Sequence, residues 1–246
     1  MTGATPVVLL HGWGVGAGVF APLAAALADR ARVSIPDLPG YGATPSCNEP
    51  TLGAFAASMK PRVEPGSVLL GWSLGALVAL RVALDCPDRI ARLVLVSGTP
   101  RFSCDATWAH GMESRLLAAF AEGLACDPGG TQRRFLGEQV LGAERSRATL
   151  ATLRSHLAGP AQVDRACLRA GLDVLATADL RDAVGALACP LLLLHGTRDR
   201  LVPAAAGAWL ADRIRGARFE PIEGAGHAPF VSHPDAVLAA LRGILP

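Results

Sequence analysis

The chain has 246 residues, of which 51% are hydrophobic and 18% are charged, and its formal net charge is +2. The large apolar fraction excludes intrinsic disorder, and the near-neutral charge excludes a general nucleic-acid-binding protein. The length fits one large domain, or one domain that carries an insertion.

The sequence predicts neither a membrane span nor an export signal. Residues 65–80 are uncharged, but the stretch is broken by three glycines and is shorter than the roughly 18 apolar residues that a spanning helix needs. Residues 1–28 contain no Lys or Arg, so they lack the positively charged start of a signal peptide. We therefore expect a cytoplasmic protein that makes no membrane contact.

Short apolar runs alternate with helix-like segments along the chain. Near-continuous apolar strands separated by helices are typical of a parallel sheet that is covered on both faces. The sequence thus predicts an α/β fold with a mostly parallel, doubly wound sheet. In chain order, the predicted strands cover residues 7–10, 33–36, 68–71, 93–97, 191–195 and 219–222, and the clearest helices cover residues 20–28 and 74–84.

The interval 101–176 interrupts this alternation. It shows no clear strand, and its helical pattern is broken by Pro-Gly and Gly-Pro steps. We expect residues 101–176 to form a helical cap over the carboxyl edge of the sheet, inserted into a core made of residues 1–100 and 177–246. Within this cap one predicted helix is amphipathic: Leu150, Leu153 and Leu157 share a face, and Arg147 and Arg154 lie opposite.

The strongest chemical signal is the GxSxG pattern Gly71-Trp72-Ser73-Leu74-Gly75. It follows a predicted strand and precedes a predicted helix, which is the context of a nucleophile elbow. The turn is too tight for side chains on the flanking residues, and it lifts the Ser73 hydroxyl above the sheet edge. Ser73 is therefore the candidate nucleophile.

A serine nucleophile needs a base, and the base needs a carboxylate that orients it. His227 lies in a loop just after the last predicted strand, and Asp199 lies just after the fifth. Both positions are at carboxyl ends of strands, where open α/β sheets bind ligands. The order Ser73, Asp199, His227 along the chain completes a candidate catalytic triad.

Acyl chemistry also needs two N–H donors for the oxyanion of the tetrahedral intermediate. The backbone N–H of Leu74, which directly follows the nucleophile, is the first candidate, and that of Trp13, in the loop after the first strand, is the second. His11 is expected to hold this loop, and His195 to have a structural role. His233 is expected in a loop or at a helix start, and His110 and His156 on the cap surface.

No metal or other cofactor is predicted. The histidines show no HExxH or comparable spacing, and the six cysteines form no CxxC pair. We expect all six thiols to be reduced.

Together these segments resemble the α/β-hydrolase family over nearly the whole chain, and more narrowly the BioH family of pimeloyl-[acyl-carrier protein] methyl ester esterases. The tryptophans beside the nucleophile and in the oxyanion loop favour this narrower family. The resemblance rests on His11-Gly12-Trp13-Gly14, Asp37-Leu38-Pro39-Gly40-Tyr41-Gly42, the Ser73 elbow, and His227-Ala228-Pro229-Phe230 followed by Ser232-His233-Pro234.

The resemblance implies a monomeric, cofactor-independent carboxylesterase of biotin biosynthesis whose partner is an acyl-carrier protein. Trp13, Ser73, Leu74 and His227 would contact the substrate, and Phe135 would contact the acyl chain. The carrier would dock on cap arginines, of which Arg134, Arg147 and Arg154 are the candidates. From residue 128 to 172 we count seven arginines (133, 134, 145, 147, 154, 165, 169) against three acids (Glu138, Glu144, Asp164), so positive charge is concentrated there.

The sequence departs from the family in two places. Too few residues precede the first strand for the β-hairpin that commonly opens this fold, so we expect about six strands rather than eight. A glycine often found after the nucleophile turn is replaced by Ala76, a small-for-small change that we expect to be tolerated.

Two other interpretations stay open. A generic short-chain carboxylesterase or a carbon–carbon bond hydrolase would share the same fold and triad. A non-catalytic binding protein on this fold is the third possibility. Dehalogenases are excluded, because they have Asp where this chain has Ser73.

Overall fold

The computed structural model describes residues 4–47, 49, 51–159, 163 and 165–245. A six-stranded sheet lies at its centre, with the order β2-β1-β3-β4-β7-β8, and every pair of neighbouring strands is parallel. Its strands are β1 (Thr5–Leu10), β2 (Ala31–Ser34), β3 (Ser67–Trp72), β4 (Ile90–Val96), β7 (Leu191–Gly196) and β8 (Arg218–Ile222).

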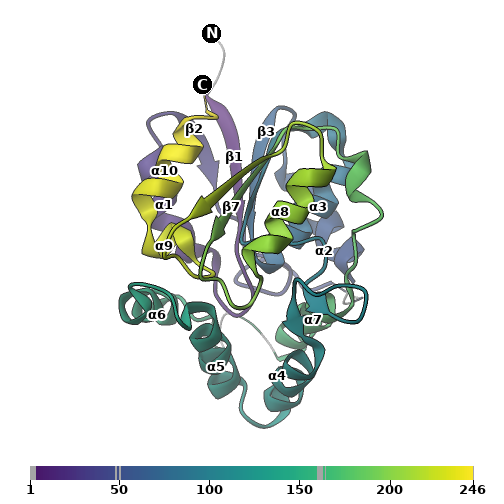
Figure 1. Ribbon diagram of the computed structural model, residues 1–246, viewed down its shortest axis with the longest axis vertical. Coiled ribbons are helices and arrows are strands. Elements are labelled where there is room, and N and C mark those ends of the chain that lie inside the picture. Colours follow the sequence, from purple (N-terminus) through teal and green to yellow (C-terminus); the bar gives the residue numbers. More distant parts are fainter. Residues whose placement is uncertain (1–3, 48, 50, 160–162, 164, 246) are drawn as a thin grey trace.

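Helices cover both faces of the sheet (Figure 1). One face carries α2 (Leu52–Met59), α3 (Leu74–Asp85) and α8 (Ala204–Arg213), and the other carries α1 (Ala21–Leu27) and α10 (Pro234–Arg242), with α9 (Pro229–Ser232) directly before α10. Single 3₁₀ turns are η1 (Ala17–Phe20), η2 (Lys60–Arg62), η3 (Pro87–Arg89) and η4 (Val184–Ala186). Every residue of β3 and β7 is buried, as expected for central strands covered on both sides.

The predicted fold class is confirmed. All six predicted strands lie in this sheet, and the two predicted core helices correspond to α1 and α3. The chain runs from β1 outward to β2 and then returns to the other side of β1 to form β3. This reversal of direction creates a switch point between β1 and β3, where open α/β sheets bind ligands at the carboxyl ends of the strands.

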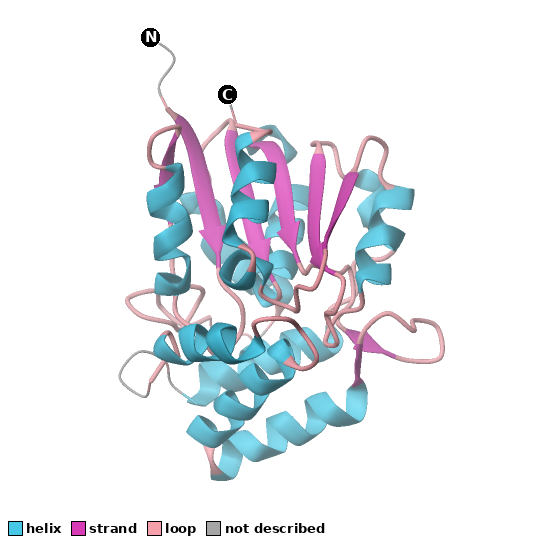
Figure 2. Cartoon of the chain, turned by 60° about the vertical axis from the view of Figure 1, so that its left-hand side comes forward, coloured by secondary structure: helices cyan, strands magenta, loops and turns pink. Residues whose placement is uncertain are grey.

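The segment between β4 and β7 contributes most of the remaining helices. These are α4 (Ser114–Cys126), α5 (Pro128–Val140), α6 (Ser146–Ser155) and α7 (Arg165–Thr177). They lie together at the end of the sheet to which the strands point (Figure 2). In α6, Leu153 is buried and Arg147 and Arg154 are exposed, as the predicted amphipathic pattern requires.

The expectation that this segment contains no strand is wrong. β5 (Ser103–Cys104) and β6 (Met112–Glu113) form a small parallel pair. Two residues per strand are too few to produce an alternating or apolar sequence pattern. The pairing depends on a loop closure in which the Met112 N–H donates to the Phe102 carbonyl at 2.8 Å.

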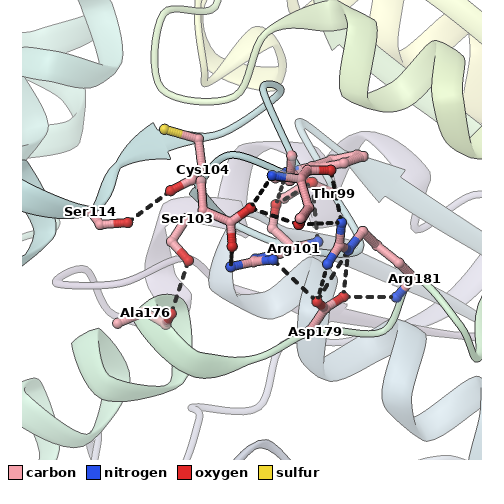
Figure 3. Close-up of polar contacts among 11 residues, drawn as sticks. Thr99, Arg101, Ser103, Cys104, Ser114, Ala176, Asp179 and Arg181 are labelled. Carbon is pink, nitrogen blue, oxygen red and sulfur yellow. Dashed lines mark hydrogen bonds and ion pairs between the residues drawn. The ribbon is translucent and has the colours of Figure 1, made fainter.

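The two chain segments that connect these helices to the sheet meet at Arg101 and Asp179, which form an isolated antiparallel bridge. The Arg101 guanidinium contacts the Asp179 carboxylate at 3.4 Å and also pairs with Asp105, and Arg181 pairs with Asp179 at 2.7 Å (Figure 3). The Ser103 hydroxyl donates to the Ala176 carbonyl at 2.9 Å across the same junction. Paired charges and hydrogen bonds therefore join the entry and exit of the helical segment.

The turn between β3 and α3 depends on two glycines. A Cβ on Gly71 would overlap the carbonyl oxygen of Gly75, and a Cβ on Gly75 would overlap the carbonyl oxygen of Leu10 at the end of β1. The obstacles are backbone atoms, so a side chain here cannot be accommodated by a rotamer change. This close approach brings the first turn of α3 against the loop that follows β1.

We predict that Gly75→Ala lowers the free energy of unfolding by about 3 kcal/mol, since overpacking against backbone forces the two segments apart. Gly137→Ala is the matched control, because a Cβ there meets nothing within 4 Å. In the interior of α5 it should stabilise by up to about 1 kcal/mol. Urea unfolding followed by tryptophan fluorescence measures both, and a Gly75→Ala protein as stable as wild type would contradict the close approach.

Candidate active site

Ser73 sits between β3 and α3 in a strained backbone conformation. Its φ is 58° and its ψ is −117°, a backbone conformation that residues other than glycine rarely adopt. Its side chain is almost completely buried, and it precedes the first turn of a 12-residue helix. The backbone N–H groups and the positive end of the α3 dipole thus lie next to the hydroxyl.

The structure brings Ser73, His227 and Asp199 into one hydrogen-bonded chain. His227 Nε2 is 2.8 Å from Ser73 Oγ, and His227 Nδ1 is 2.7 Å from Asp199 Oδ2. The other carboxylate oxygen, Asp199 Oδ1, accepts the backbone N–H groups of Leu201 and Val202 at 3.0 Å each. All three side chains that form the chain are buried.

The protonation states follow from these contacts. Burial raises the pKa of Asp199, but the nearby His227 charge and hydrogen bonds from His195 and His227 lower it by more, so this pKa falls below its ordinary range. An ionised carboxylate only accepts hydrogen bonds, so His227 Nδ1 carries a hydrogen. With its hydrogen on Nδ1, the ring can use Nε2 to accept the proton of the Ser73 hydroxyl, which lies 2.8 Å away.

The residue before the nucleophile holds the histidine loop in place. Trp72 Nε1–H donates to the His227 carbonyl at 2.7 Å. The His227 backbone N–H donates to the Gln139 carbonyl of α5 at 3.0 Å. The histidine backbone is therefore fixed from the sheet on one side and from α5 on the other.

The loop after β1 lies against the nucleophile. A Cβ on Gly12 would lie 3.3 Å from Ser73 Cβ and 3.0 Å from the Trp72 ring. No hydrogen bond runs from the backbone N–H of Trp13 or of Leu74 to another residue in the described part of the chain. Both groups are thus available as donors beside Ser73. Trp13 Nε1–H donates to the Leu168 carbonyl of α7 at 2.7 Å, which ties this loop to the helical segment.

His11 holds the same loop, as the sequence predicts. The Leu38 backbone N–H donates to His11 Nε2 at 2.9 Å, and His11 Nδ1 is 2.8 Å from the Gly12 carbonyl. One nitrogen therefore accepts and the other donates, which fits only the neutral ring. Burial, only partly offset by the Gly12 carbonyl and the Asp37 charge, lowers the pKa of His11 to about 4.

Aromatic side chains line the site from the helical segment. The Phe135 ring of α5 is 4.8 Å from the Trp13 ring and 5.2 Å from the Phe120 ring. Phe102, which sequence reasoning missed, is fully buried with its ring 6.4 Å from the His227 ring. Its only sequence signal is its place at the start of the helical segment, just after a strand that ends at the site.

Gln139 was also missed. It lies one helical turn after Phe135 on α5 and is buried, and both polar atoms of its side chain lack a hydrogen-bond partner among the described residues. Because a buried amide without a partner is costly, this side chain is a candidate for contact with a bound polar group. A single glutamine in a helical pattern carries no sequence signal for such a role.

Of the remaining predicted residues, only His195 contacts a triad residue in the described part of the chain, namely Asp199. Arg134, Arg147 and Arg154 are exposed on α5 and α6, so the structure does not bring them to Ser73. His233 is the N-cap residue of α10, and His110 and His156 are half-buried rather than fully at the surface. His195 lies beside Asp199. Within the described ranges no cluster of His, Cys, Asp or Glu could hold a metal ion, and no helix is long and apolar enough to cross a bilayer.

The neutral His11 makes stability depend on pH. Its pKa is about 4 in the folded chain and 6.5 as an unperturbed group, so between these values the unfolded chain binds a proton that the folded chain does not. We predict that the free energy of unfolding falls as pH drops from 6.5 towards 4, by at most about 1.4 kcal/mol per pH unit.

The measurement is urea unfolding at several pH values for wild type and His11→Gln, which removes the titrating ring. The stability advantage of wild type over the variant should shrink through this window and level off below it. A difference that is constant from pH 7 to 4 would show that His11 is not buried in the neutral form.

Comparisons with known proteins agree with the fold and show which family the chain resembles. The model of the alpha/beta hydrolase family matches residues 7–240. A relative from Aromatoleum aromaticum is 42% identical over 97% of this chain and 97% of its own length, and one from Nitrosomonas europaea is 40% identical over 99% and 97%. Each of these relatives is named pimeloyl-[acyl-carrier protein] methyl ester esterase.

Solved structures show the same fold at lower sequence identity. An esterase from Exiguobacterium antarcticum matches with a TM-score of 0.87 at 22% identity, covering 98% of this chain and 91% of that one. The enol-lactonase from Burkholderia xenovorans matches with a TM-score of 0.80 at 23% identity, covering 98% and 90%. From the family model, these relatives and the shared fold, we conclude that this chain belongs to the α/β-hydrolase family.

Proposed function

We propose that this protein is a serine carboxylesterase that hydrolyses the methyl ester of pimeloyl-[acyl-carrier protein], a reaction of biotin biosynthesis. The observation that carries the proposal is the buried hydrogen-bonded chain Ser73–His227–Asp199, in a protein 42% identical along almost its full length to an esterase of that name. The proposal includes a cytoplasmic, monomeric enzyme.

In the proposed mechanism Ser73 Oγ attacks the ester carbonyl while His227 Nε2 takes the hydroxyl proton. Asp199 stabilises the imidazolium through the Nδ1 hydrogen bond. His227 then returns the proton to the departing methoxide, which leaves as methanol. Water, deprotonated by the same nitrogen, attacks the acyl-enzyme and releases the carboxylate product and Ser73.

The oxyanion of each tetrahedral intermediate would be bound by the backbone N–H groups of Trp13 and Leu74. Support comes from their position beside Ser73 and from the absence of another hydrogen-bond acceptor for them in the described residues. The role belongs to the backbone, and the Trp13 side chain has a separate contact with Leu168.

The acyl chain would lie against the aromatic side chains that face the triad. Phe135 packs on Trp13, and Phe102 lies close to His227, so a methylene chain beside them would be removed from water. Gln139 would offer its unpartnered amide to a polar group of the same substrate. A cavity of about 240 Å³, lined by residues that include Gln132, Arg165 and Leu168, lies where the helical segment meets the oxyanion loop and offers room for the arm that carries the acyl group.

The carrier protein would dock on the helical segment 101–176, which we propose acts as a cap. All seven arginines counted in the sequence between 128 and 172 are exposed. Of these only Arg169, with Asp173, forms an ion pair within the described part of the chain. Asp164, one of the acids counted there, lies outside the described residues. Exposed arginines that have no ion-pair partner among the described residues would steer an acidic carrier towards this segment.

A generic carboxylesterase or a carbon–carbon bond hydrolase remains the alternative within the same fold. The solved structures similar to this chain include an esterase and an enol-lactonase, and at such low identity they support the fold alone. A purely binding protein is the less favoured alternative, since a binder has no need for a base and an ionised carboxylate aligned behind a serine.

We predict that Ser73→Ala lowers turnover of p-nitrophenyl butyrate by about 10⁴-fold or more, because the variant lacks the attacking oxygen. Steady-state kinetics measure the effect, and unfolding in urea verifies that the variant is folded. If the folded variant kept wild-type turnover, both the esterase mechanism and the triad would be wrong, and a binding protein would be favoured.

We predict that kcat/KM for pimeloyl-carrier-protein methyl ester exceeds that for free dimethyl pimelate and decreases with added salt. Reversing two cap charges, in Arg134→Glu with Arg147→Glu, should lower kcat/KM for the carrier-bound ester about tenfold and leave the free ester unchanged.

The control is Arg92→Glu, an exposed arginine near the start of β4, at the opposite end of the sheet from the cap. This substitution should leave kcat/KM unchanged for both the carrier-bound ester and the free ester. Equal turnover of free and carrier-bound esters by wild type would reduce the function to a generic carboxylesterase.

A further inference from the structure

A second histidine lies beside the carboxylate of the triad. His195, near the end of β7, is fully buried, and its Nε2 is 2.8 Å from the Val202 carbonyl and 3.5 Å from Asp199 Oδ2. Asp199 Oδ2 is also the oxygen that accepts from His227 Nδ1. The two imidazoles thus approach the same carboxylate oxygen.

The hydrogen on His195 can be placed from its partners. The Val202 carbonyl only accepts hydrogen bonds, so Nε2 carries the hydrogen that points towards Val202 and Asp199. The other nitrogen, Nδ1, is buried and has no hydrogen-bond partner among the described residues. A hydrogen on Nδ1 would leave a buried N–H without an acceptor, so the neutral ring with hydrogen on Nε2 fits the site.

A glycine in α8 leaves space for the His195 ring. Gly207 lies inside α8, where glycine costs about 1 kcal/mol relative to alanine. A Cβ there would lie 2.9 Å from His195 Nδ1 and 2.7 Å from the Phe219 ring. The helix therefore makes room for the imidazole, which leaves it few alternative orientations.

Among the described residues, the titratable side chains that contact the Asp199 carboxylate are these two imidazoles. Its other contacts are the backbone N–H groups of Leu201 and Val202. The charged side chains of the elements that pack on β7 lie at or near the surface. Four of the five are exposed, and the fifth, Glu220, is half-buried and forms an ion pair with Arg218. The five are Arg92 of β4, Asp212 and Arg213 of α8, and Arg218 and Glu220 of β8.

We propose that His195 is a positioning residue of the esterase, which fixes the Asp199 loop through Val202 and shares the negative charge of Asp199 Oδ2 with His227. The inference rests on the proposed function for the role of Asp199. The N–H of His195 stabilises the carboxylate and weakens its pull on the His227 proton, because each additional donor reduces the charge available to the others.

The test compares His195→Leu, which removes the donor, with His195→Gln, whose side-chain N–H can replace it. Phe219→Leu is the control, since Phe219 contacts the same ring but not Asp199. If His195→Leu does not fold, His195→Met supplies the variant without a donor, because methionine adapts to irregular space. Protonation of His227 is followed by NMR across pH, a readout that needs no substrate.

We expect His227 to become protonated about half a pH unit higher in His195→Leu than in wild type. The kcat for p-nitrophenyl butyrate should fall about tenfold, with KM changed less than twofold. His195→Gln should restore both values, and Phe219→Leu should change neither. An unchanged or lower titration midpoint in the donor-free variant, or no recovery with glutamine, would overturn the positioning role. If wild type itself lacked esterase activity, the proposed function would fail, while the NMR titration would still decide the role of His195 at Asp199.

Discussion

The arrangement of the site depends on one backbone contact, the approach of Gly75 to the Leu10 carbonyl. Because no side chain separates them, the first turn of α3 and the loop after β1 lie against each other at the switch point of the sheet. Ser73 is held between them with a positive φ. The strain in that turn is maintained by the buried strands on either side, so the hydroxyl is already in position before any substrate arrives.

Two tryptophans extend this contact to the rest of the molecule. The indole N–H of Trp72 reaches the His227 loop, and that of Trp13 reaches α7, each with a 2.7 Å hydrogen bond to a carbonyl 155 residues away in sequence. Both side chains are fully buried. Trp72 therefore fixes the loop that carries the base, and Trp13 fixes the helical segment 101–176 through α7.

Charge is separated between the interior and the surface. Inside, Asp199 is a buried negative charge surrounded by N–H groups, and His11 is kept neutral by burial. Outside, the arginines of α5, α6 and α7 are exposed and mostly unpaired within the described residues. An apolar acyl chain and an acidic carrier would thus meet different parts of the same segment, one buried and one exposed.

The sequence by itself determined the sheet, because long apolar strands such as residues 191–195 are local patterns. It also identified Ser73, Asp199 and His227 as a set, because loops at the carboxyl ends of parallel strands meet at one edge of the sheet. The tertiary structure alone decided which side chains support them: Phe102, Gln139 and His195 gain their importance from neighbours distant in sequence. The same holds for β5 and β6, which one loop closure creates. Contacts between residues that are distant in sequence produce no periodic pattern and no motif in the sequence, so only the tertiary structure shows them.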